Sequence, residues 1–586
     1  MTLLVVAELK TESPLLMVKK TRWVSVGAAA LEIVLTVLLI YYSTRNIQKC
    51  ENSYPKTGSW KEDKDCCTWD GVVCDNSTRH VIALDLSCSW LYGSIPSNST
   101  LFLLRHLRSL NLAGNDFHSI ISPEFGNFQS LTHLNLSHSR FYGEIPYEIS
   151  QLSSLVSLDL SYNSDPRGPS SYFRSQLTLS IETPVWKRVI GNLTQLRELF
   201  LDATDMSSIT PNSLMNLSSS LTTLSLGECH LQGTFEINVF RLPCLQTLDL
   251  GYNSNLEGSL PKSIGSLKFL EYLNLRSCNF TGAIPTSIGN LTQIIKLDLS
   301  ENSFSGLLPL SIFDLPNLSV LYLDNNQLVG PLPNHVSGLN LLIDLSLSLN
   351  FLNGTLPSWL FSLTSLVTLD LGYNRFIGEI GEFKYNNSLD YLDLSYNMLQ
   401  GSIPSSISRL VNLSYLSLSS NNLQGSVPSS ISRLVNLTYL SLSSNNLQGS
   451  IPSSISRLVN LTTLYLSSNN LSIMLDLEMT PFIAKLVGFV AFEIIVSALL
   501  SIKCPVTCKV LFWLVVALKN RGKHTLDCLS GIISLLVVLE LEFVMIYALV
   551  NLLHSCQGVD FKIKLLTIGG KRLKLTIRDT GIIQSY

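Results

Sequence analysis

Three consecutive 24-residue segments in the second half of the chain repeat almost the same sequence. They cover residues 389–412, 413–436 and 437–460, and the third reads LTYLSLSSNNLQGSIPSSISRLVN. Self-similarity at a fixed period of this length is typical of a solenoid, in which each coil stacks on the next and no single globular core exists. This periodicity limits the possible folds more strongly than any other feature of the 586-residue sequence.

Each segment follows the template L-x-x-L-x-L-x-x-N-x-L. In the third segment Leu437, Leu440 and Leu442 are spaced by three and two, so their side chains point inward from a short strand. Tyr439 alternates with them and points outward. Asn445 is expected to turn the chain and to bond backbone groups that have no ladder partner. The template is that of a leucine-rich repeat, in which stacked neighbours supply the core.

Recognisable repeats cover residues 81–477, where we count about sixteen, the last of them incomplete. The period is broken once, by residues 164–188, which contain three prolines and are interpreted as a surface loop that leaves the solenoid. A degenerate repeat is the alternative. The predicted fold class is therefore an α/β solenoid, a right-handed leucine-rich-repeat superhelix.

Charge and motifs exclude several classes of function. The formal net charge is −3 and no basic face runs through the repeats, which argues against a nucleic-acid partner. No phosphate-binding glycine loop, H-R-D or D-F-G motif is present, and the nine histidines are scattered. The sequence predicts no catalytic residues, no cofactor and no metal, and therefore no enzyme.

A cysteine-rich segment, residues 50–80, precedes the first repeat. It contains Cys50 and the run C-C-T-W-D-G-V-V-C from Cys66 to Cys74. Because the end of a solenoid exposes an apolar cross-section, we interpret this segment as a disulfide-held cap. Sequence alone allows three pairings of four cysteines. A metal site is the alternative, but adjacent cysteines are poorly spaced as zinc ligands.

Three sequence runs resemble plant leucine-rich-repeat receptor-like proteins of the disease-resistance type. They are W-D-G-V from Trp69, L-D-L-S-C-S from Leu84, and the L-x-G-x-[IL]-P turn of Leu447–Pro452. The resemblance extends over about residues 50–477. It implies a cell-surface ectodomain at the plasma membrane, without a kinase of its own. Such a protein recognises an extracellular peptide or protein ligand and signals with a leucine-rich-repeat receptor kinase as co-receptor, here in plant defence.

The same resemblance implies the cap disulfides, which are expected to join Cys67 to Cys74 and Cys50 to Cys66. It also agrees with the fourteen N-x-S/T sequons, which serve as glycosylation sites only in a secreted chain. Some sequons arise merely because the repeat ends in Asn-Leu-Thr or Asn-Leu-Ser. The predicted glycosylation sites are Asn76, Asn98, Asn135, Asn192, Asn216, Asn279, Asn290, Asn317, Asn353, Asn386, Asn412, Asn436, Asn460 and Asn470.

Both ends of the chain contain apolar stretches. Residues 1–49 are interpreted as a targeting segment, in which apolar residues 23–42 form either a signal anchor or a cleaved signal peptide. Residues 478–556 include two stretches long enough to span a bilayer as helices. Translated non-coding sequence is the alternative for this region.

The basic tail, residues 557–586, resembles a fragment of a Rab-type small GTPase. No phosphate-binding loop exists anywhere in the chain, so no nucleotide binding is expected. A fused gene or a mistaken gene model explains such a tail.

Outward-facing strand residues line the concave face of a curved solenoid, its usual binding surface. Tyrosines recur there at two strand positions and are suited to recognition of a peptide or protein. A general preference of aromatic residues for strands is the alternative. The candidate ligand-binding residues are Tyr272, Tyr391, Tyr415 and Tyr439 at one position and Tyr322 and Tyr465 at the other.

The sequence thus predicts a membrane-tethered receptor that binds an extracellular ligand. A secreted or tethered binding, decoy or inhibitor protein with the same repeats is one alternative, and a non-functional fused gene model is another. GTPase chemistry is suggested only by the tail.

Overall fold

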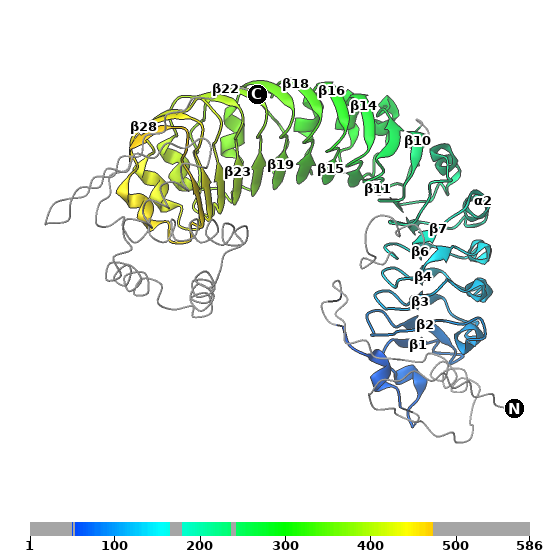
Figure 1. Ribbon diagram of the computed structural model, residues 1–586. Coiled ribbons are helices and arrows are strands. Elements are labelled where there is room, and N and C mark those ends of the chain that lie inside the picture. The colour runs from blue at the N-terminus through cyan, green and yellow to red at the C-terminus, as the bar shows by residue number, and fades with distance from the viewer. Residues whose placement is uncertain (1–49, 51–52, 62, 164–177, 236–241, 473–586) are drawn as a thin grey trace, which may run out of the picture. The chain divides into compact units, whose positions relative to one another are not determined.

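The computed structural model describes residues 50, 53–61, 63–163, 178–235 and 242–472 (Figure 1). These residues fall into two compact units, a first unit that ends at Cys229 and a second unit that begins at His230. The expected targeting segment, the apolar stretches of residues 478–556 and the Rab-like tail lie outside the described residues. Among the described residues, no helix has both the length and the apolar character that a bilayer crossing requires.

The predicted repeat strands form parallel sheets, one strand from each coil. In the first unit, β1 (Val72–Cys74) of the cap pairs antiparallel with the first repeat strand, and the following strands pair in parallel. These repeat strands are β2 (Val81–Asp85), β3 (Ser109–Asn111), β4 (His133–Asn135), β6 (Ser157–Asp159), β8 (Glu198–Phe200) and β9 (Thr223–Ser225).

The second unit continues the pattern with ten parallel strands. They are β11 (Thr247–Asp249), β13 (Tyr272–Asn274), β15 (Lys296–Asp298), β17 (Val320–Tyr322), β19 (Asp344–Ser346), β21 (Thr368–Asp370), β23 (Tyr391–Asp393), β25 (Tyr415–Ser417), β27 (Tyr439–Ser441) and β29 (Thr463–Tyr465). In Figure 1 the labelled strands β11, β15, β19 and β23 follow the inner side of this unit's curve. We call the outward-pointing side chains of these ten strands, and of the residues just after them, the strand face.

A second set of strands, which the sequence analysis did not predict, lies on the other side of the turn. In the second unit these strands are β10 (Gln232–Phe235), β12 (Asn255–Gly258), β14 (Asn279–Ala283), β16 (Ser303–Leu307), β18 (Gln327–Pro331), β20 (Phe351–Thr355), β22 (Arg375–Glu379) and β24 (Met398–Gln400), followed by β26 (Gln424–Gly425), β28 (Asn446–Ser450) and β30 (Asn470–Ser472). They coincide with the x-L-x-G-x part of the repeat. Its glycine has a left-handed φ, for example +79° at Gly378, which a residue without Cβ adopts at low cost.

The chain returns through short 3-10 helices. They are η1 (Lys56–Ser59), η2 (Cys66–Thr68), η3 (Thr100–Leu103), η4 (Pro123–Asn127), η5 (Tyr147–Gln151), η7 (Pro211–Asn216), η9 (Lys262–Ser266), η10 (Thr286–Asn290), η11 (Leu310–Asp314), η12 (Ser358–Ser362), η13 (Ser405–Arg409), η14 (Ser429–Arg433) and η15 (Ser453–Arg457). The predicted α/β class needs this correction, since the helical part is almost entirely 3-10. A return segment of three to six residues is too short for a stable α-helix.

The segment interpreted as a loop, residues 164–188, is in part a regular element of the coil. Within its described portion, β7 (Leu179–Ser180) pairs in parallel with β5 (Gly143–Glu144), and α2 (Thr183–Asn192) begins. The side chain of Trp186 on α2 is fully buried. Pro184 lies in the first turn of α2, where a missing N–H has no intrahelical partner to lose. Proline therefore starts a helix here, and the loop prediction is wrong for this part.

The leucines and the turn asparagine form the core together. Leu437, Leu440 and Leu442 are fully buried, as the template predicts. In a middle coil, Asn374 Nδ2 lies 2.9 Å from the carbonyl oxygen of Leu347 in the preceding coil and 3.2 Å from that of Leu371 in its own. The buried amide thus bonds carbonyl groups of two coils. Other asparagines at this position that bond the preceding coil in the same way include Asn302, Asn326, Asn350, Asn397, Asn421, Asn445 and Asn469.

Cysteine replaces this asparagine in two coils. The thiol of Cys229 donates to the carbonyl of Leu201 at 3.1 Å, and that of Cys278 donates to the carbonyl of Leu250 at 3.2 Å. Both side chains are buried. A thiol therefore retains the bond to the preceding coil.

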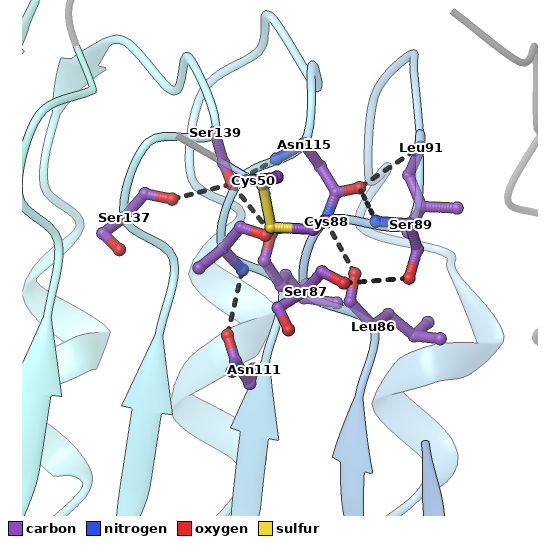
Figure 2. The surroundings of a disulfide bond; sticks show 12 residues. Cys50, Leu86, Ser87, Cys88, Ser89, Leu91, Asn111, Asn115, Ser137 and Ser139 are labelled. Carbon is purple, nitrogen blue, oxygen red and sulfur yellow. Dashed lines mark hydrogen bonds between the residues drawn. A yellow bond between two sulfur atoms is a disulfide. The ribbon is translucent and has the colours of Figure 1, made fainter. Parts of the chain in front are cut away.

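The cap is joined to the repeats by one disulfide and tightened by another. Cys67 pairs with Cys74, the pairing that the resemblance implies. The expected Cys50–Cys66 bond is wrong, because Cys50 pairs with Cys88, just after β2 (Figure 2). Cys66 is a buried free thiol, and its sulfur lies within 4.8 Å of the sulfurs of Cys67 and Cys74. The expected pairing kept both disulfides within residues 50–80, whereas the partner of Cys50 lies in the first repeat.

The asparagine core generates a stability prediction. Asn374→Ala leaves several buried backbone groups without a partner and should lower the free energy of unfolding by about 3 kcal/mol. Asn374→Cys should cost clearly less, because Cys229 and Cys278 show that a thiol can donate at this position. Urea denaturation followed by circular dichroism measures both variants. Equal losses for the two variants would contradict the role given to the side-chain donor.

The disulfide pattern generates a second prediction. Peptide mapping under non-reducing conditions should yield a Cys50–Cys88 peptide and a Cys67–Cys74 peptide. Cys66 should resist alkylation in the native chain and react after unfolding, because burial hides its thiol and raises its pKa. Recovery of a Cys50–Cys66 peptide would contradict the structure.

Candidate ligand-binding face

Register brings three of the predicted tyrosines together. Tyr391 pairs with Tyr415, and Tyr415 with Tyr439, on adjacent strands β23, β25 and β27. Both pairs of rings are stacked, with centroids 4.3 Å apart. Tyr465 on β29 meets Tyr439 edge to face at 5.8 Å. These four rings form one continuous group, which we call the tyrosine ladder.

The other two predicted tyrosines lie apart from the ladder, around a lysine. Lys296 Nζ lies 5.3 Å from the ring centroid of Tyr272 on one side and 5.7 Å from that of Tyr322 on the other. Both are cation–π contacts. The six tyrosines therefore form two groups on the strand face, one of which already holds a cation.

Five carboxylates, which the sequence analysis missed, extend from the first group to the ladder; four are half-buried and one, Asp298, is buried. They come from consecutive coils and occupy the strand face at β15, β17, β19, β21 and β23 or directly after these strands. We call this set the carboxylate strip, and it consists of Asp298, Asp324, Asp344, Asp370 and Asp393. Three of them are the Asp of a recurring Leu-Asp-Leu run, which was the signal available in the sequence.

The strip is crowded with like charges. Burial, the neighbouring carboxylate of Asp393 and that of Asp324 raise the pKa of Asp370 to about 6. Burial and the charge of Asp298 also raise the pKa of Asp324. Among the described residues, no lysine, arginine or histidine nitrogen forms an ion pair with Asp344, Asp370 or Asp393. The hydrogen bonds that Asp370 accepts, such as that from the Gly372 N–H at 3.0 Å, offset burial only in part.

The same carboxylates raise the pKa values of neighbouring tyrosines. Burial and the charges of Asp393 and Asp370 raise the pKa of Tyr391 to about 12. Burial and the charges of Asp344 and Asp298 likewise raise the pKa of Tyr322. The phenols therefore remain neutral at physiological pH and can donate a hydrogen bond.

The structure also locates the predicted glycosylation sites. All fourteen asparagines lie in the described residues, and all are exposed except Asn135 and Asn317, which are half-buried. None of them lies at an outward position of strands β11 to β29 in the second unit. No predicted attachment point therefore lies on the strand face of that unit.

A metal centre finds little support in the described part of the chain. The one group of side chains there whose ligand atoms lie close enough to share an ion is Cys66, Cys67 and Cys74. Two of these sulfurs are bonded to each other, so they are not available as thiolate ligands.

Comparison with known proteins agrees with this geometry. The family described as "Leucine rich repeat" matches residues 80–164, 270–328, 380–423 and 412–471, and a second repeat profile matches residues 244–267. The described coils and these matches define the class: the chain is a leucine-rich-repeat protein.

Within that class, the chain is similar to plant receptors. It is 40% identical to "Receptor-like protein 6" of Arabidopsis thaliana over 221 residues, which cover 37% of this chain and 21% of the relative. The structure titled "Crystal structure of a TDR receptor" is 31% identical, with a TM-score of 0.61 and coverage of 72% of this chain and 70% of that one. The Arabidopsis receptor kinase HAESA, solved with the peptide hormone IDA and the co-receptor SERK1, is 28% identical with a TM-score of 0.54, covering 76% and 82%. The matched stretch spans about a fifth of the curated relative.

The crowded carboxylates generate a prediction about pH. The folded pKa of Asp370 lies above its ordinary value, so the folded chain binds a proton more tightly than the unfolded chain does. This residue's contribution to stability therefore falls as pH rises from about 4 through about 6, by up to about 3 kcal/mol. Asp370→Asn should raise the melting temperature at pH 8 and change it little at pH 4.

The matched control is Glu382→Gln, which removes an exposed carboxylate outside the strand face. Thermal unfolding of both variants at the two pH values measures the effect. An Asp370→Asn variant that is less stable than the wild type at pH 8 would show that the hydrogen bonds of this carboxylate outweigh its repulsion.

Proposed function

We propose that this protein is a cell-surface receptor-like protein that recognises an extracellular peptide or protein through the strand face of its second unit. It signals together with a leucine-rich-repeat receptor kinase, in plant defence, with the repeats outside the plasma membrane. The proposal assigns no enzymatic activity, cofactor, nucleotide or nucleic acid to the chain.

The tyrosine ladder is the observation that carries the proposal. Its rings present a rigid amphipathic surface that carries hydroxyl groups, and such surfaces contact peptides and proteins at low cost in side-chain entropy. The solvent-facing positions of a repeat strand do not contribute to the leucine core. Aromatic residues there gain no stability from that core, which favours a role in binding.

Two further observations support an extracellular location and a peptide ligand. The cap contains two disulfides, which persist in oxidising compartments. None of the fourteen sequons lies on the strand face of the second unit, which suits a binding surface. HAESA, whose structure contains a peptide hormone and a co-receptor, has a similar ectodomain.

The test uses the purified full chain and a phage-displayed library of random 12-residue peptides. Peptides selected on the wild type should bind the variant Tyr391→Ser/Tyr415→Ser/Tyr439→Ser at least tenfold more weakly, because each aromatic contact contributes about 1 kcal/mol. Dissociation constants from biolayer interferometry measure the loss.

The matched control is Tyr373→Ser/Tyr396→Ser. These two tyrosines are also stacked and exposed, with ring centroids 4.0 Å apart, but they lie outside the strands of the strand face. Their removal should leave binding within twofold of the wild type. Equal losses in the two variants, or selection of the same peptides on the triple variant, would contradict the proposed binding face.

A further inference from the structure

We infer that the ligand of the strand face is a basic peptide segment, whose arginine or lysine side chains lie on the carboxylate strip between Tyr322 and Tyr391. This inference rests on the proposed function, because it names the chemistry of the ligand for the same face.

Side-chain size defines where such a cation lies. Between β17, which carries Tyr322, and β23, which carries Tyr391, the face is formed by β19 and β21. Their outward residues are Asp344 and Ser346 on β19 and Thr368 and Asp370 on β21, all much shorter than tyrosine. With adjacent strands about 4.8 Å apart, the two tyrosine-bearing strands are separated by about 14 Å, which is wide enough for one or two extended side chains.

Charge decides which side chains fit there. The strip holds four half-buried carboxylates and the buried Asp298. The cations near its first end are already engaged, since Lys296 lies between the rings of Tyr272 and Tyr322 and Arg276 pairs with Glu301. Burial first, and repulsion by neighbouring carboxylates in addition, raises the pKa values of Asp324 and Asp370. A bound cation would relieve this repulsion, whereas a carboxylate, phosphate or sulfate would add to it. An arginine would form a charge-assisted pair of hydrogen bonds with these groups.

The aromatic rings add a second contact of the same kind. Lys296 shows that a cation is accommodated beside tyrosine rings on this face. Tyr391 is the last ring of the stack, and its neighbour on the side away from Tyr415 is Thr368, which is not aromatic. One ring face of Tyr391 therefore lies toward β21, which carries Thr368 and Asp370, and a guanidinium can stack on it there.

A single metal ion is a poorer occupant of the strip. In the described residues, no three of its carboxylates bring their oxygens close enough together to share one ion. The charges are instead distributed along consecutive coils, which matches a chain that carries several cations at intervals. A basic peptide has that distribution.

The test compares three acetylated and amidated hexapeptides, in which glycine alternates with arginine, glutamine or glutamate. Binding to the purified full chain is measured by isothermal titration calorimetry at low ionic strength, because salt screens exposed charges. The arginine peptide should bind, and the glutamine and glutamate peptides should bind at least tenfold more weakly. The variant Asp324→Asn/Asp370→Asn/Asp393→Asn should bind the arginine peptide at least tenfold more weakly than the wild type.

The matched control, Glu257→Gln/Asp314→Asn/Glu382→Gln, removes the same number of charges from exposed positions outside the strand face. It should bind the arginine peptide within twofold of the wild type. Equal losses of affinity in the two variants would mean that only the net charge of the protein attracts the peptide, and this would overturn the inference. Equal binding of the glutamine peptide would overturn it as well.

The affinity should also fall several-fold from pH 7.5 to pH 5. Asp393, Asp324 and the phenol of Tyr391 lie close enough to interact with Asp370, and Asp344 is on the adjacent strand β19. Proton uptake by Asp370 in this range removes one charge from the strip. The control variant should show the same pH dependence as the wild type, whereas the strip variant should lose it. An affinity that rises at pH 5 would contradict the inference.

The phage-display selection separates this inference from the proposed function. Peptides that need the tyrosine ladder but are not enriched in arginine and lysine would overturn the basic ligand and leave the receptor function in place. If none of the selected peptides depended on the tyrosine ladder for binding, the proposed function would be overturned.

Discussion

Stacking of one coil on the next is the interaction on which the whole structure depends. A single repeat has too little apolar surface to bury its leucines, and it has turn carbonyls without strand partners. The next coil supplies both needs, since its leucines cover the apolar side and its asparagine bonds the carbonyls, as Asn374 does toward the coil of Leu347. The stability of the solenoid is therefore approximately the sum of the contributions of its coils and of the contacts between neighbouring coils.

Because the inward leucines and the turn residues stabilise the coil, the residues of the strand face are free to vary. The inward positions must be leucine or a close substitute, and the turn position must donate hydrogen bonds, which is why cysteine is accepted in place of asparagine at Cys229 and Cys278. The outward strand positions have no such duty. Tyrosines, carboxylates and a lysine accumulate there in an order that the core does not require, and this makes the face the reasonable place for recognition.

A receptor function accounts for both the cap and the strand face. The disulfide-held cap and the exposed sequons suit an oxidising, extracellular compartment, and the face that carries the tyrosines and carboxylates is free of sequons in the second unit. The inferred basic ligand specifies the chemistry that this receptor would recognise. The carboxylates of the strip are close enough to shift one another's pKa values but too dispersed to hold one ion.

The repeat period alone determined the coil, its buried leucines, the turn asparagine and the strand positions of all six tyrosines. These features follow from contacts that recur at a fixed spacing, so a pattern in one dimension contains them. Only the tertiary structure decided that Cys50 bonds Cys88, that proline starts α2, and that five separated aspartates form one strip. Such features depend on which coils become neighbours and on the electrostatic interactions between them. The spacing of residues along the chain does not reveal either.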